Sequence, residues 1–265
     1  MSIFEKFLIY SLNSKHLPKL GIVIPAYNEA GNIVALVREV ARIVPHAVVR
    51  VVDDSPNFTT VTALANAAIP NATVEHRDKK SGRGSAVICG IRYLREAGCD
   101  VVVEMDADFS HPPSQLPALV NRLTDQGADM VVASRYLPDS QIENWPMSRK
   151  LFSRAANWLA KTLLSVPVSD YTNGYRAYSR PAMDVILAHC GKLGVGFIPL
   201  SEILVNIYYR GLRVTELPTK FVNRLRGESS VNATELKHAI VGLMKIFWLK
   251  RQLTRDTALT SHEIA

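Results

Sequence analysis

The sequence VVVEMDADFSHPP, residues 101–113, joins a run of valines to two aspartates and two prolines. The valines are β-branched and continuous, which predicts a strand that is buried on both faces. This strand leads directly to Asp106 and Asp108 and is stopped by the prolines. We therefore expect two carboxylates at the carboxyl end of a buried strand, which is where open α/β sheets bind their ligands.

The two aspartates need partners, because a carboxylate that is buried without a cation or hydrogen-bond donors is costly. A hard divalent ion, held by one or two carboxylates and by the phosphates of a substrate, meets this need. A short D-x-D pattern also occurs in turns that only cap a helix, and by itself it favours that simpler interpretation. The rest of the chain decides between the two.

Composition limits the classes of protein to consider. The chain has 265 residues, 48% of them hydrophobic, which is enough for one large α/β domain or two small ones. Its net charge of +7 predicts an anionic partner: a nucleic acid, a phosphorylated ligand or a lipid surface. The three cysteines lack the spacing of a metal site and fit a reducing compartment. No apolar run reaches the roughly 18 residues of a transmembrane helix, so none is predicted.

Strands and helices alternate along the first half of the chain. This alternation predicts a mostly parallel sheet with right-handed crossovers. We expect strands at 20–25, 47–52, 73–77, 101–105 and 128–134, and helices at 31–44, through Val61 and Leu64, from Gly84 to Glu96 and at 114–126. The second half is less regular, with helices at 148–165, 182–190, 200–210 and 234–251, a strand at 212–217, a loop at 169–181 and a frayed end at 254–265.

Six polar motifs follow one another at or after the predicted strands. They are IPAYNEAGNI (24–33), VVDDS (51–55), MDADFSHPP (105–113), ASRYLP (133–138), YTNGYRAYSR (171–180) and FVNRLRGESS (221–230). In this order they closely resemble the family 2 glycosyltransferases of the GT-A fold, and within them the dolichyl (polyprenyl) phosphate mannose synthases. The resemblance covers about residues 18–235. It implies a Rossmann-like, mostly parallel sheet flanked by helices in a single domain, preceded by an amphipathic segment at 1–17 and followed by a basic amphipathic helix and tail at 236–265.

The resemblance also implies roles for individual residues. Asp106, Asp108 and Arg135 take the catalytic positions, and the metal ligands are Asp106, Asp108 and Ser110, where Ser110 replaces a glutamine of some relatives. Acceptor binding falls to Tyr175, Arg176 and Ser229, although Tyr175 can equally be a core aromatic. Donor binding falls to Pro25, Tyr27, Glu29, Asp53, Asp54, Asp106, Ala107, Asp108, Arg135, Arg224 and Arg226.

Two positions leave alternatives open. Gly84 lies in a glycine-rich turn that either lets the backbone approach the nucleotide of the donor or is a plain tight turn into a helix. Asp54 is followed by Ser55 and Pro56 where the family usually has glycine, so the base and the sugar of the donor stay open. His111 is interpreted as a turn residue beside Pro112 and not as a metal ligand.

The implied reaction is the metal-dependent, inverting transfer of a sugar, above all mannose from GDP-mannose, to a polyprenyl (dolichyl) phosphate. Mg²⁺ or Mn²⁺ and arginines would neutralise the leaving diphosphate. A lipid phosphate is already deprotonated near neutral pH, so no general base is assigned. The alternatives are a UDP-sugar transferase with the same or another acceptor, a basic nucleic-acid-binding module, and a membrane-bound scaffold without activity; the intact aspartates favour the enzyme, without nucleic acid as a partner.

A polyprenyl acceptor lies in a bilayer, so the sequence also needs a means of reaching a membrane. In the predicted helix at 234–251, Ile240, Leu243, Met244 and Phe247 share one face beside basic residues. The segment at 1–17 would add a second contact. We therefore expect peripheral binding at the cytoplasmic face of a membrane; the alternative is that both helices pack on the domain or on a partner membrane subunit.

Overall fold

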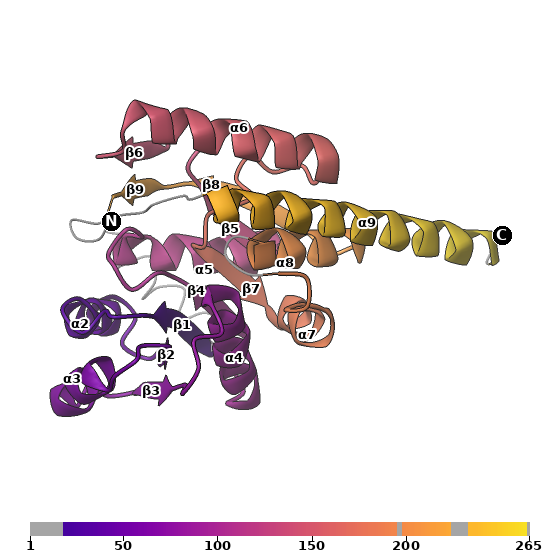
Figure 1. Ribbon diagram of the computed structural model, residues 1–265. Helices are drawn as coiled ribbons and strands as arrows, with labels where there is room; N and C mark the ends of the chain where they lie inside the picture. The colour runs from indigo at the N-terminus through magenta and orange to yellow at the C-terminus, as the bar shows by residue number, and fades with distance from the viewer. Residues whose placement is uncertain (1–17, 195–197, 224–232, 264–265) are drawn as a thin grey trace.

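Strand β4 (Val101–Glu104) lies in the middle of a seven-stranded sheet, as shown by a computed structural model that describes residues 18–194, 198–223 and 233–263 (Figure 1). The order of the strands is β3-β2-β1-β4-β7-β5-β8. All four residues of β4 are buried, as expected for a strand that is covered on both faces.

The sheet is parallel except for one strand. Neighbours β1 (Leu20–Ala26), β2 (Val48–Asp53), β3 (Ala72–His76) and β4 run in the same direction, and β5 (Met130–Ser134) is parallel to β8 (Val214–Pro218). Strand β7 (Arg176–Ser179) is antiparallel to both β4 and β5. The sheet and its helices confirm the predicted fold class.

Helices cover both faces of the sheet (Figure 1). One face carries α2 (Ile33–Ile43), α3 (Thr59–Ala67), the short 3₁₀ turn η1 (Pro113–Gln115) and α5 (Leu116–Gln126). The other carries α4 (Arg83–Glu96), α7 (Arg180–His189) and α8 (Ile198–Tyr209), and α9 (Ala233–Glu263) packs on α8 and on α6 (Met147–Leu164).

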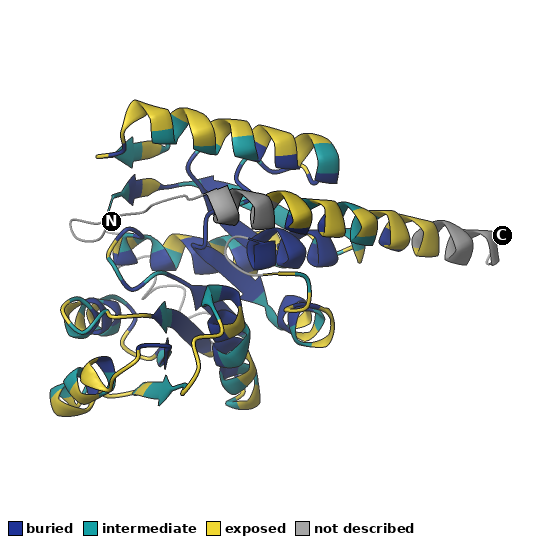
Figure 2. Ribbon diagram, viewed as in Figure 1, coloured by how far each residue is buried: buried dark blue, intermediate teal, exposed yellow. Residues whose placement is uncertain are grey.

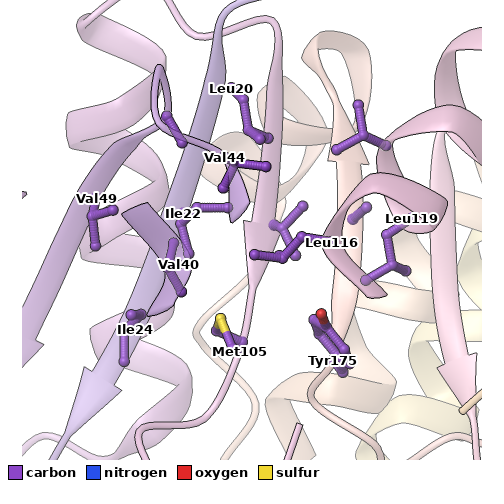
Figure 3. Close-up of a cluster of buried hydrophobic side chains, with 14 of the residues drawn as sticks. Leu20, Ile22, Ile24, Val40, Val44, Val49, Met105, Leu116, Leu119 and Tyr175 are labelled. Atoms are coloured by element: carbon purple, nitrogen blue, oxygen red, sulfur yellow. The ribbon is translucent and has the colours of Figure 1, made fainter. Parts of the chain in front are cut away.

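Alternation along the strands divides the core into two clusters. Ile22 and Ile24 of β1 point into the cluster beneath α2 and α5 (Figure 3). Val23, between them, belongs to the cluster beneath α4. The same alternation separates Val103 from Val102 in β4. Because both clusters anchor β1 and β4, the turns after these two strands start from fixed positions.

Strand β7 differs from the sequence prediction, which placed a loop at 169–181. Its four residues, RAYS, are too few to show a period, and a charged residue is unusual in the middle of a sheet. Arg176 is nevertheless fully buried, because its guanidinium donates to the backbone oxygens of Asn173, Leu200 and Tyr171 at 2.8, 2.6 and 2.9 Å. Tertiary hydrogen bonds thus hold this strand, and no local sequence pattern reveals them.

A second sheet and the last helix also depart from the prediction. Strands β6 (Gln141–Glu143) and β9 (Lys220–Val222) form a small parallel pair that was not expected. Helix α9 continues to Glu263, where a frayed end was predicted. Its predicted apolar face is divided: Leu243 and Phe247 are half-buried against the core, whereas Ile240 and Met244 are exposed together with Val241 and Trp248.

Some predictions fall outside the described residues. These are the amphipathic segment at 1–17 and the roles of Arg224, Arg226 and Ser229. Among the helices of the described part of the chain, none combines the length and the apolar character needed to span a bilayer.

Gly90 tests how closely α4 packs on the sheet. A Cβ atom at this position would lie 2.3 Å from Cγ2 of Val23 and 3.3 Å from Cγ2 of Val52. We expect Gly90→Ala to lower the free energy of unfolding by about 1–3 kcal/mol, because neither valine can move away without shifting its strand. Urea denaturation measures the change. Gly31→Ala, which meets no atom within 4 Å, is the control and should stay within about 0.5 kcal/mol of the parent; equal effects of both substitutions would contradict close packing.

Candidate active site

A cavity of about 470 Å³ opens at the carboxyl ends of β1 and β4. Its wall is built from the turn after β1, the glycine-rich turn before α4, the D-x-D turn after β4, the inner side of α6 and strand β9. This is the edge at which the strand order changes direction between β1 and β4, the usual ligand site of an open α/β sheet.

The D-x-D turn presents its polar groups to this cavity. Asp106, Ala107, Asp108 and Ser110 all line the wall. Oδ1 of Asp108 accepts a hydrogen bond from the backbone N–H of Ser110 at 3.0 Å. Phe109, between them, has a φ of 61°, a backbone conformation that residues other than glycine rarely adopt. The hydroxyl of Ser110 is buried and makes no hydrogen bond within the protein. A strained turn with an unpartnered polar atom is typical of a binding site.

Arg83, the first residue of α4, was not among the residues expected at the site. Its Nε and Nη2 atoms donate to Oδ1 of Asp106 at 2.9 and 2.7 Å, and its Nη1 atom donates to Oε1 of Glu104 at 2.5 Å. Glu104 is fully buried, and its Oε2 atom accepts the hydroxyl of Tyr178 at 2.7 Å. One guanidinium therefore pairs with two carboxylates, one at the end of β4 and one in the turn that follows it. The only sequence signal was an arginine inside the glycine-rich turn, which was interpreted through its glycines.

This pairing keeps Asp106 ionised. Burial works to raise the pKa of the Asp106 carboxyl, but the charge of Arg83 outweighs burial and lowers the pKa to about 2. Oδ1 of Asp106 is used by Arg83, while Oδ2 lies 3.8 Å from Nε2 of His111. At neutral pH the turn thus presents two carboxylates, one of which is held by a fixed cation.

His111 is a structural residue of the same turn. Its Nδ1 accepts the backbone N–H of Asp106 at 3.0 Å, so this nitrogen carries no proton. The proton is then on Nε2, which donates to Oδ1 of Asn173 at 2.9 Å. Burial lowers the pKa of His111 and favours this neutral form. Because both ring nitrogens are occupied, the interpretation of His111 as a turn residue agrees with the structure.

Arg135 reaches the cavity but already has a partner. It forms a bidentate ion pair with the fully buried Asp170, at 2.7 and 2.8 Å, and also donates to the hydroxyl of Thr172 at 2.7 Å. Burial opposes ionisation of Asp170, but Arg135 overcomes it and lowers the pKa of the carboxyl. Arg135 therefore fixes the loop before β7 to the end of β5.

The two acids after β2 are placed differently. Asp54 lines the cavity, but it accepts hydrogen bonds from Nε and Nη2 of Arg77 at 2.6 and 2.7 Å and from the backbone N–H groups of Ser81 and Gly82. Asp53 lies outside the wall, where it accepts the hydroxyl of Ser55 and lies 3.1 Å from Nδ1 of His76. Both carboxylates thus shape the turns that form this side of the cavity.

The turn after β1 lies at the cavity, which is the position predicted for it. Pro25, Tyr27 and Glu29 line the cavity. The Tyr27 ring is exposed and lies 3.7 Å from Nζ of Lys80, which also lines the cavity. Gly84 does not line it; a Cβ atom there would lie 2.3 Å from Cβ of Pro199, so this glycine serves close packing.

Tyr175 and Arg176 are enclosed by the core. The Tyr175 hydroxyl donates to the backbone oxygen of Pro112 at 2.9 Å, and neither side chain lines the cavity. Neither residue therefore exposes a surface with which it could bind the acceptor, the role predicted for both. A cation that was not predicted, Arg149 of α6, does line the cavity: its guanidinium lies 4.2 Å from the ring centre of Trp145, and Nη1 donates to Asn223 at 3.1 Å.

The chain is similar in sequence to several known proteins. The sequence model described as glycosyl transferase family 2 matches residues 21–187. The polyprenol monophosphomannose synthase of Mycolicibacterium smegmatis is 37% identical over 224 residues, 83% of each chain. The undecaprenyl-phosphate mannosyltransferase of Micrococcus luteus is 38% identical over 230 residues, 84% of this chain and 91% of that protein. The dolichol-phosphate mannosyltransferase of Pyrococcus furiosus is 34% identical over 218 residues, 80% of this chain but 59% of that longer protein.

Solved structures agree in fold. The glucosyl-3-phosphoglycerate synthase of Mycobacterium tuberculosis superposes with a TM-score of 0.64 at 20% identity, covering 92% of this chain and 85% of that one. Its complex with Mn²⁺, uridine diphosphate and phosphoglyceric acid gives a TM-score of 0.63 at 20% identity, covering 87% and 78%. The family model covers more than half of the chain, including the D-x-D turn, and the relatives named above are 34–38% identical to it, so the chain belongs to glycosyl transferase family 2.

Proposed function

We propose that this glycosyltransferase moves mannose from GDP-mannose to a polyprenyl phosphate, in a metal-dependent reaction that inverts the anomeric carbon. The observation that carries the proposal is that one cavity holds the two D-x-D carboxylates together with Lys80, Arg83 and Arg149. Such a cavity can bind two anions, the diphosphate of the donor and the phosphate of the acceptor. The polyprenyl phosphate and mannose are supported by the names of the relatives at 37 and 38% identity.

The residues present fit a divalent ion that completes its coordination with the donor. Asp108 offers a carboxylate at the cavity wall, Asp106 offers Oδ2, and the unpartnered hydroxyl of Ser110 lies in the same turn. Among the described residues, no three acidic, histidine or cysteine side chains gather into an enclosed metal site. This is the pattern of Mg²⁺ or Mn²⁺ sites, which use one or two carboxylates, water and substrate phosphates.

The bound ion would neutralise charge on the diphosphate as it leaves. The protein's own residues prepare the site for this event. Arg83 fixes Asp106 in one orientation, and the bidentate pair of Arg135 with Asp170 holds the loop before β7 against the cavity. The Tyr27 ring and Lys80 also line the cavity, where an aromatic face and a cation suit a nucleoside and its phosphates.

The acceptor phosphate needs orientation more than activation. A phosphate oxygen is already an anion at neutral pH, so direct attack on the anomeric carbon needs no general base and inverts that carbon. Arg149 supplies a cation on the α6 side of the cavity. We propose that Arg149 orients the acceptor phosphate, a role that the sequence interpretation gave to Tyr175, Arg176 and Ser229.

A UDP-sugar remains the second candidate donor. It is supported by Ser55 and Pro56 after the acids of β2 and by the uridine diphosphate in the complex of the structural relative. We further propose that residues 18–235 are the catalytic unit and that the protein acts at the cytoplasmic face of a membrane, alone or with a membrane subunit. The net charge of +7 supports binding at the cytoplasmic face, because the cytoplasmic leaflet carries anionic lipids.

Asp108→Asn tests the metal assignment. The side chain keeps its shape and its contact with Ser110, so the melting temperature should change little, whereas turnover should fall by about 100-fold or more because a neutral amide is a poor ligand for a hard cation. Transfer of labelled sugar to a short polyprenyl phosphate, measured with Mg²⁺ and with Mn²⁺, gives the result. Activity at the level of the parent enzyme with either ion would disprove the assignment.

A donor screen tests the nucleotide. With Mn²⁺ present, GDP at about 100 times its dissociation constant should stabilise the protein by about 2.7 kcal/mol, and UDP at the same concentration by less. Thermal unfolding with each nucleotide, with and without Mn²⁺, measures the difference. A larger shift with UDP would favour the second candidate donor, and a shift that is independent of Mn²⁺ would contradict a shared metal–diphosphate site.

Arg83→Met tests whether Arg83 positions Asp106 or only balances charge. Alone, this substitution leaves Glu104 buried without a cation and should cost about 3 kcal/mol of stability. Adding Glu104→Gln removes the unpaired charge and should restore most of the stability. If Arg83 is a positioning residue, the double variant still needs more Mn²⁺ for half-maximal activity and loses about tenfold or more in kcat/KM. Full recovery of both quantities would show that Arg83 serves folding alone.

A further inference from the structure

Helix α6 has an outward face that no other described part of the chain covers. Met147, Leu151 and Trp158 are 77%, 69% and 68% exposed, and Phe152 and Leu159 are exposed as well. Figure 1 shows α6 at the periphery of the molecule, and Figure 2 shows that its outer side is exposed along its length. Large apolar side chains that gather on one surface are typical of an interaction site.

The two sides of α6 have separate tasks. Asn157, Ala160 and Leu164 recur at spacings of three and four and are buried against the protein. Met147, Leu151 and Trp158 recur at spacings of four and seven, so they share the opposite side. Between these sides, Arg149, Phe152, Ser153 and Ala156 line the active-site cavity.

The charges of α6 select among the partners that an apolar face could have. The helix contains four basic residues and no acidic residue. Arg154 and Lys161 are exposed and lie along one flank of the apolar side, beside Trp158. An apolar face with an aromatic residue and a basic flank is complementary to an anionic bilayer surface, where the rings enter the headgroup boundary and the cations meet lipid phosphates.

We propose that the outward face of α6 docks the enzyme on an anionic lipid bilayer and thereby places the cavity mouth at the level of the acceptor's phosphate. We define this docking face as Met147, Leu151, Trp158 and Leu159 with Arg154 and Lys161. The inference rests on the proposed function for the nature of the acceptor. Because one helix, about 10 Å wide with its side chains, separates the bilayer from the cavity, a polyprenyl phosphate can reach Arg149 while its chain stays in the membrane.

The docking face differs from the one that the sequence predicted on the last helix. In α9, Lys250 donates to the backbone oxygen of Leu163 and to the hydroxyl of Ser165, at 2.9 and 2.7 Å, so this lysine joins α9 to the end of α6. Leu243 and Phe247 pack toward the core. These contacts make α9 a support for α6, and among the described residues of these two helices only those of α6 line the cavity.

The test measures flotation of the full chain with two kinds of vesicle, phosphatidylcholine alone and phosphatidylcholine mixed with phosphatidylglycerol. The parent protein should float with the anionic vesicles at low salt and be released as salt increases. Trp158→Ser should reduce the partition coefficient about tenfold, because a large apolar side chain no longer enters the lipid. Phe58→Ser is the matched control: Phe58 is 61% exposed, yet it precedes α3, so this variant should stay within about twofold of the parent.

The same flotation assay tests the contribution of the basic residues. Arg154→Glu with Lys161→Glu should weaken binding to anionic vesicles about tenfold or more, since each cation near the surface contributes about 1 kcal/mol, or roughly a fivefold change. Arg38→Glu with Arg92→Glu changes the net charge equally, but these exposed arginines lie on α2 and α4. This control should keep most of the binding. Equal losses in the two pairs would show that net charge and not the docking face determines binding, which would overturn the proposal.

Activity separates the docking face from the catalytic site. Trp158→Ser should keep its melting temperature and its transfer rate to a short, water-soluble polyprenyl phosphate, and should lose transfer to a long acceptor in vesicles. If no acceptor is used by any form, the proposed function fails while flotation still reports on docking. The proposal is overturned if Trp158→Ser floats as well as the parent, if the parent does not float, or if sedimentation without vesicles shows a dimer that this substitution dissociates.

Discussion

The ion pairs of Arg83 with Asp106 and Glu104 are the interaction on which the site depends. A fully buried glutamate at the end of a central strand is costly unless a cation reaches it. Arg83 supplies that cation from the first turn of α4, so the helix must begin where its first side chain can span the distance to β4. The same guanidinium orients Asp106, and in this way a requirement of folding fixes the geometry of the D-x-D turn.

Around this centre the protein uses its charges in two ways. The inner charges are paired with one another: Arg135 with Asp170, Arg77 with Asp54, and Arg83 with the acids of β4. These pairs hold the loops that form the wall, and they leave little net charge in the wall itself. Asp108 and Lys80 line the cavity without belonging to one of these pairs, which suits groups that bind a substrate and release a product.

The sequence predicted most of the parallel half of the sheet and the position of the D-x-D turn. Valine runs in β4 and β5 and the spacing of Ile33, Leu36, Val37 and Val40 in α2 are local signals that do not depend on the rest of the chain. What the sequence could not predict depends on distant contacts. Arg176 was assigned to acceptor binding, because only the folded chain brings three carbonyl oxygens around its guanidinium. Arg83 was interpreted as part of a turn, because only the folded chain places Glu104 and Asp106 opposite it. The outward side of α6 could not be told from its buried side, because apolar residues occur on both.

The reversed strand β7 has a consequence for how the chain acquires its fold during synthesis. It lies between β4 and β5, so these two strands cannot be bridged until residues 176–179 have left the ribosome. Until then β4 is an open edge of the sheet, and β5 has no hydrogen-bonded neighbour, because its other partner β8 comes still later in the chain. Such unpaired edges attract other chains. An emerging polypeptide shorter than about 180 residues therefore has one four-stranded sheet with an open edge and one unpaired strand, and the first two-thirds of translation is the period in which this protein most needs protection from aggregation.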